Sequence, residues 1–175
     1  MKKRFSGGIV AIMAISMLLL TAGCSANNEE IEVRDYNNTI VNIQQKMLEQ
    51  ASNNAASLQN GELDANKSLQ QFEAILANVQ QSEKDFTTIK VPKGAESLSS
   101  SMSKFFEVEQ NGVKSIITAI QNLKGQEKNE QALRILVKSL DDFSRNESEV
   151  MNSFNQTQQQ VAAKYGKSIQ VPTNK

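Results

Sequence analysis

The sequence predicts an all-α fold, an antiparallel up-down-up-down four-helix bundle. Four segments carry apolar residues at alternating steps of three and four, the spacing that keeps side chains on one face of a helix. No segment shows the period-two alternation that is typical of a strand. Aromatic residues make up only 5% of the chain and Trp is absent, so we expect a mainly aliphatic core with a few Phe rings.

The first two helices are expected between residue 31 and the Val91-Pro92 pair. Gly61 follows the first apolar stripe as a stop signal, and Asp64 is then placed to cap the second helix. Helical backbone is disfavoured for the residue before Pro, so the second helix should end there. The stripe residues are Tyr36, Ile40, Ile43, Met47, Ala51, Ala55 and Leu58 in the first helix, and Leu69, Phe72, Ile75, Leu76, Val79 and Phe86 in the second.

The third helix is expected to begin near Gly94 and to end at Gly125, and the fourth to end near Tyr165 with Gly166 as a C-terminal cap. Connections of about three to seven residues between long helices make neighbours antiparallel. The stripe residues are Leu98, Met102, Phe105, Val108, Ile116, Ile120 and Leu123 in the third helix, and Leu133, Leu136, Leu140, Phe143, Val150, Phe154, Val161 and Tyr165 in the fourth.

A weak internal repeat raises the alternative of two tandem helical hairpins. Ile89-Lys90-Val91-Pro92 closes the second helix, and Ile169-Gln170-Val171-Pro172 follows the fourth. Duplication of a hairpin is one interpretation, and convergence on an effective helix stop is the other. We favour convergence, because only three residues match.

The first 24 residues have the three regions of a secretory signal. A cationic cluster, Lys2-Lys3-Arg4, is followed by an apolar run over residues 9–20 and by small residues directly before Cys24. The apolar run is too short to cross a hydrocarbon core of about 30 Å. We therefore expect this segment to be cleaved.

Leu20-Thr21-Ala22-Gly23-Cys24 resembles the lipobox of bacterial lipoprotein precursors. The resemblance implies cleavage between Gly23 and Cys24 and an S-diacylglycerol group on Cys24, whose amine is then acylated or free. It also implies a protein anchored by lipid on the extracytoplasmic face of a cell membrane. Thr21 departs from the family pattern, in which Leu is commonest at this position.

These signals divide the chain into four parts. Residues 1–23 are the expected signal peptide, residues 24–30 the lipidated cysteine with a short polar tether, residues 31–166 the bundle, and residues 167–175 a C-terminal tail. The resemblance to lipoprotein precursors covers only the first 24 residues. No family is recognised for the helical part.

The residue types that remain after the leader argue against catalysis. His is absent and Cys24 is the single cysteine, so the usual general bases and thiol nucleophiles are missing, and no glycine-rich phosphate loop follows the leader. We expect no enzymatic activity and no cofactor. The chain after the leader holds 16 basic and 19 acidic residues, and this negative balance argues against a nucleic-acid partner.

Three acidic residues, Glu83, Glu109 and Glu147, fall close to core positions of the predicted helices. Inward carboxylates could bind a metal, but bundles that do so also use His, so we expect no metal site. The favoured interpretation is that helical drift relative to a strict heptad turns these positions toward solvent.

The aromatic residues Tyr36, Phe72, Phe105, Phe106, Phe143 and Phe154 are interpreted mainly as core. Adjacent Phe105 and Phe106 point about 100° apart, so we predict that Phe106 is an exposed partner contact. We expect a noncatalytic, membrane-anchored interaction or accessory module whose partner is an envelope protein or a cell-wall polymer. The alternative is a ligand-binding or sensing lipoprotein with an apolar pocket between its helices.

Overall fold

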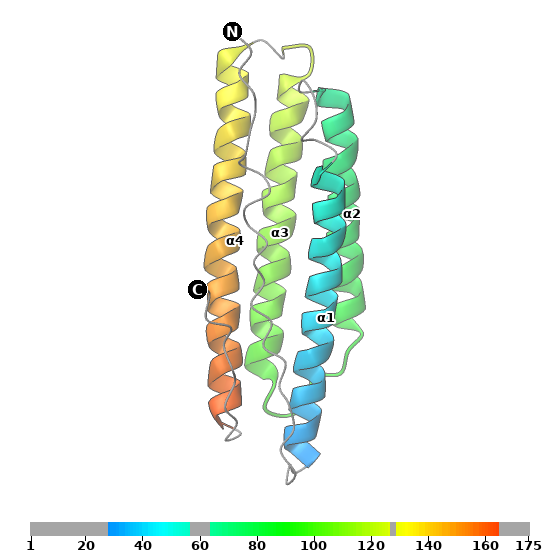
Figure 1. Cartoon of the computed structure of the whole chain (residues 1–175), viewed down its shortest axis with the longest axis vertical. Helices are drawn as coiled ribbons and strands as arrows, with labels where there is room; N and C mark the ends of the chain where they lie inside the picture. Colours follow the sequence, from blue (N-terminus) through cyan, green and yellow to red (C-terminus); the bar gives the residue numbers. More distant parts are fainter. Residues whose placement is uncertain (1–27, 57–63, 127–128, 165–175) are drawn as a thin grey trace.

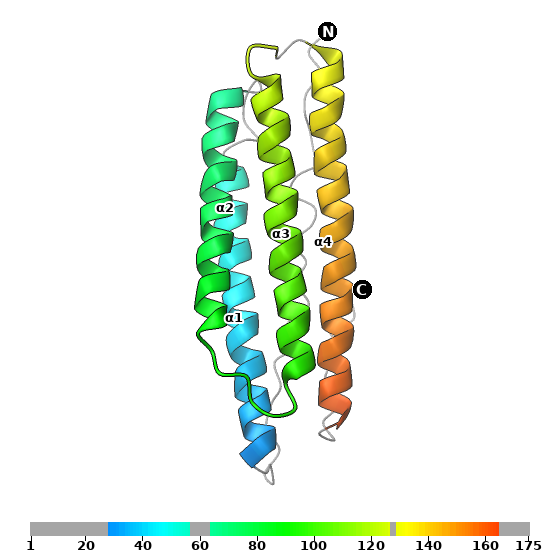
Figure 2. The ribbon, with the colours of Figure 1, turned by 180° about the vertical axis from the view of Figure 1, so that it is seen from behind.

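The computed structural model describes residues 28–56, 64–126 and 129–164, and for residues 51–56 it describes the backbone alone. Within these ranges the chain forms four helices, α1 (Asn28–Ala56), α2 (Ala65–Thr87), α3 (Glu96–Leu123) and α4 (Glu130–Lys164). Figures 1 and 2 show them side by side in one elongated bundle. This part of the chain contains no strand, so the all-α prediction is confirmed.

Successive helices run in opposite directions along the bundle (Figure 1). The most extensive packing joins α3 to α4, followed by α2 to α3 and α1 to α2. The prediction of an antiparallel four-helix bundle is therefore confirmed. Among the described residues, no helix has both the length and the apolar composition that a membrane span requires.

Side-chain caps fix where α2 and α4 begin. The Asp64 carboxylate accepts hydrogen bonds from the backbone N–H groups of Asn66 at 2.9 Å and Lys67 at 3.1 Å, as the predicted cap requires. Asn129 does the same for α4, accepting from the N–H groups of Gln131 and Ala132. This second cap was not predicted from the sequence.

Two glycines allow the tight connections on either side of α3. Gly94 has φ 91° and Gly125 has φ 76°, values in the left-handed region that favours glycine. The Gly94 N–H also donates to the carboxylate of Glu96, the first residue of α3. The predicted limits of the third helix are therefore close to those observed.

The start of α1 differs from the expected domain boundary. The helix begins at Asn28, whereas we expected a polar tether up to residue 30. Acidic residues stabilise a helix N-terminus by interacting with its partial positive charge, and Glu29 and Glu30 occupy the first turn of α1. The remainder of the tether and the expected segments 1–23 and 167–175 lie outside the described residues, as do Leu58, Gly61, Tyr165 and Gly166.

Residues from all four helices form a single core. Helix α3 lies between α2 and α4 and is therefore buried on a wide face that includes Val113, Ile117 and Ala119 beyond the predicted stripe. Some stripe residues are only partly buried, mainly on α4. The predicted stripe residues that are buried are Tyr36, Ile40, Met47, Phe72, Ile75, Val79, Phe86, Leu98, Met102, Phe105, Ile116, Ile120, Leu123, Leu136, Phe154 and Val161.

Phe106 is part of this core, so its prediction as an exposed partner contact is wrong. Its relative exposure is 0%. Its ring lies 5.6 Å from that of Phe86 and 6.0 Å from that of Phe105, measured between centroids. Two adjacent residues can both be buried here because α3 packs against neighbours on two sides, which makes its buried face wider than one stripe.

Candidate functional site

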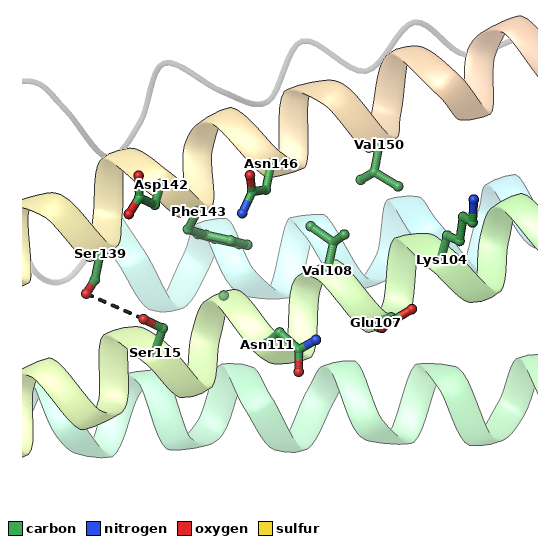
Figure 3. A pocket seen from close by; sticks show the side chains of 11 residues that line it. Lys104, Glu107, Val108, Asn111, Ser115, Ser139, Asp142, Phe143, Asn146 and Val150 are labelled. Atoms are coloured by element: carbon green, nitrogen blue, oxygen red, sulfur yellow. Dashed lines mark hydrogen bonds between the residues drawn. The ribbon is translucent and has the colours of Figure 1, made fainter.

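A groove lies along the seam between α3 and α4, near the middle of both helices (Figure 3). Its volume is about 380 Å³, within the range of binding sites for small ligands. Exposed polar side chains form the rim, and half-buried apolar side chains form the floor. The lining residues are Lys104, Glu107, Val108, Asn111, Gly112, Ser115, Ser139, Asp142, Phe143, Asn146 and Val150.

The floor depends on a glycine in the interior of α3. A Cβ atom built on Gly112 would lie only 2.0 Å from Cδ2 and 2.8 Å from Cγ of Phe143. Glycine inside a helix lowers the stability of that helix by about 1 kcal/mol relative to alanine. Here the missing side chain lets the Phe143 ring lie against α3, where it projects into the groove from α4 (Figure 3).

Ion pairs and hydrogen bonds organise the rim on the α4 side. Asp142 pairs with Lys138 and, at 2.8 Å, with Arg145. The hydrogen bond from Lys138 is the main reason why the pKa of Asp142 is below its ordinary value. The Ser115 hydroxyl donates across the seam to that of Ser139 at 3.5 Å, so a polar contact joins α3 and α4 at one end of the groove, on the left in Figure 3.

Two of the three acidic residues singled out in the sequence are buried, one on each of the two helices that line the groove. Glu109 is 4% exposed and Glu147 is 7% exposed, so the interpretation that drift turns them to solvent is wrong for both. Burial raises the pKa of Glu147 to about 7. Burial, and then the nearby charge of Glu147, raise the pKa of Glu109 well above its ordinary value.

The third acidic residue, Glu83, has a different environment. It is half-buried on α2, and its carboxylate accepts a hydrogen bond from the side-chain amide of Gln110. It therefore does not join the other two carboxylates. In the described ranges, no group of three or more acidic, His or Cys residues is arranged to hold a metal ion.

Two polar contacts join α1 to α4 inside the bundle. The Gln158 side-chain amide donates to Oδ1 of Asn37 at 2.8 Å, and that of Gln44 donates to the sulfur of Met151 at 2.9 Å. Asn37, Gln44 and Gln158 are each at most 2% exposed. These buried polar residues were not predicted from the sequence. They follow the same three-and-four spacing as the apolar stripes, so extending that search to Asn and Gln would have found them.

Among the aromatic residues considered as pocket candidates, only Phe143 lines the groove. The other five, Tyr36, Phe72, Phe105, Phe106 and Phe154, are buried as core. Gly23 and Cys24, the predicted cleavage and lipidation residues, lie outside the described residues. No protein-family model, curated protein or solved structure matches the chain.

Proposed function

We propose that this protein is a noncatalytic, lipid-anchored module of the bacterial cell envelope that holds another envelope component in the α3–α4 groove. The groove carries the proposal, because it combines a floor that includes the Phe143 ring with a polar rim. Its small volume suits an extended peptide segment or one chain of a cell-wall polymer. A cofactor and a nucleic acid are not part of the proposal.

The alternative, a ligand pocket between the helices, is less well supported. The centre of the bundle is filled by large side chains with less than 2% exposure, among them Phe105, Phe106 and Phe154. Protein interiors packed in this way leave little room for a ligand without rearrangement. The surface groove is therefore the better candidate for recognition.

The anchor is tested by a substitution at Cys24. Two acyl chains bury enough methylene groups to hold a protein on a membrane, whereas the bundle offers no span of its own in the described residues. We expect the wild-type protein in the membrane fraction and Cys24→Ser in the soluble extracytoplasmic fraction. Equal membrane retention of both would reject the lipid anchor.

The docking site is tested by site-specific photocrosslinking in living cells. A photoreactive residue at Asn146, on the groove rim, should give discrete adducts with a protein or a carbohydrate polymer. Asn152, exposed on the same helix and absent from the groove lining, provides the matched control. Adducts that form equally at both positions, or at neither, would contradict docking in the groove.

A further inference from the structure

Glu109 and Glu147 are buried acidic residues on the two helices that form the groove. The residues beside them in the chain, Val108 and Asn146, line the groove. Glu109 belongs to α3 and Glu147 to α4, the most extensively packed pair of helices. A change in the charge of these buried groups therefore acts inside the two helices that supply the groove walls.

The carboxyl of Glu109 lacks the partners that a buried anion requires. Its Oε1 atom is buried and has no hydrogen-bond partner, and Glu147 is the one charged side chain that perturbs its ionisation. A buried carboxylate without a nearby cation or hydrogen-bond donors is strongly destabilised. Such a group usually keeps its proton and stays neutral. The environment therefore favours a bound proton.

The other charged groups on the surrounding helices do not supply that missing cation. On α2, Glu83 is an acid and already accepts from Gln110. On α4, Lys138 and Arg145 pair with Asp142 at the surface. The remaining charged residues of the neighbouring turns are exposed: Lys46 and Glu49 on α1, Glu73 and Lys84 on α2, Lys104, Glu107 and Lys114 on α3, and Asp141 and Glu149 on α4.

We propose that the Glu109–Glu147 pair is a proton-dependent clasp, which closes the α3–α4 seam when it is protonated and loosens the groove walls when it ionises. This inference names a regulation of the groove and so rests on the proposed function for its biological meaning. The clasp itself is a property of the bundle. It can be measured without any partner.

The direction of the effect follows from the pKa values. Both pKa values are raised in the closed bundle, so a proton binds the closed seam more tightly than an opened, hydrated seam. Stabilisation by the bound proton is complete below pH 4.5, which is the ordinary pKa of a Glu carboxyl. It is lost as the pH rises through about 7, the pKa of Glu147. The clasp therefore closes in acid and loosens above neutral pH.

Amide hydrogen exchange of the full chain in detergent, followed by mass spectrometry from acid to mildly alkaline pH, tests the clasp. After correction for intrinsic exchange, the opening of residues 105–113 and 143–151 should increase between pH 4.5 and 7. The increase should be up to about tenfold per pH unit for each carboxyl that keeps its proton in the closed bundle, and up to about a hundredfold where both do. Glu109→Gln and Glu147→Gln keep a side chain of similar shape without its titration. Each should reduce the slope of this pH profile by about half, and the double variant should flatten it.

An exposed acid on α4 that does not line the groove, Glu149, provides the matched control. Glu149→Gln should keep the wild-type pH profile. A wild-type profile without pH dependence, or an equal loss of slope in the control variant, would overturn the clasp. The outcome is independent of the crosslinking result: adducts at Asn146 with a flat exchange profile would leave docking standing and reject the regulation.

A second measurement covers the case in which a variant does not fold. Carbon-13 NMR titration of the Glu side-chain carboxyls in the wild-type chain should show two groups that titrate above the rest. Titration of every Glu carboxyl near the ordinary value would overturn the proposal.

Discussion

The close approach of Phe143 to Gly112 makes Gly112→Ala a sharp test of how the groove is built. Replacing glycine by alanine inside a helix normally stabilises it by about 1 kcal/mol. Here the new Cβ would lie 2.0 to 2.8 Å from three atoms of the Phe143 ring, including Cγ at its root, so the ring must move. Overpacking of this kind typically costs about 1–3 kcal/mol. We expect no gain in stability, or a loss of up to about 2 kcal/mol.

The same substitution should have the opposite effect once the ring is removed. In a Phe143→Ala background the clash is absent, so Gly112→Ala should stabilise by about 1 kcal/mol. Urea unfolding followed by circular dichroism gives the four free energies of this double-mutant cycle, with an expected coupling of about 1–3 kcal/mol. A gain of about 1 kcal/mol from Gly112→Ala in the wild-type background would refute the reasoning.

Three further predictions concern stability. Phe106→Ala should destabilise the bundle by about 3–5 kcal/mol in urea unfolding, because it empties a fully buried site; a change below about 1 kcal/mol would contradict its burial. Asp64→Ala should cost about 1 kcal/mol through loss of the α2 cap, whereas Asp64→Asn should cost much less. Glu147→Gln should raise the unfolding free energy above pH 7 by about 3 kcal/mol and leave it nearly unchanged below pH 4.5, because the raised pKa penalises only the ionised form; equal effects at both pH values would exclude that origin.

The fold was predictable because its signals are local and repeated along the chain. Apolar residues at steps of three and four marked each helix, and Asp64 and Gly125 marked two of the helix limits. A single stripe could not indicate how many neighbours a helix has. The burial of Phe106 depends on α3 packing against two helices, which is information about tertiary packing that the local pattern does not contain.

The candidate site was much less predictable. Glu109 and Glu147 were noticed because they fall near the stripes, but their burial conflicts with the ordinary preference of charged groups for water, so the solvent-facing interpretation was favoured. The groove depends on Gly112 standing opposite Phe143, a pairing between residues far apart in the chain. Neither Gly112 nor Phe143, taken alone in the sequence, indicates that the two residues are in contact.

If Cys24 carries the lipid anchor, the position of the groove along the bundle axis limits which envelope components the groove can contact. α1 and α3 begin at the same end of the bundle (Figure 1), and Gly112 lies about 24 Å along α3 from Glu96 at 1.5 Å per residue. Asn28 follows Cys24 so closely that the intervening chain spans at most about 14 Å. An upright bundle would then hold the groove well beyond the lipid headgroups. This position favours an extracytoplasmic protein segment or a wall polymer over a lipid as the docked component.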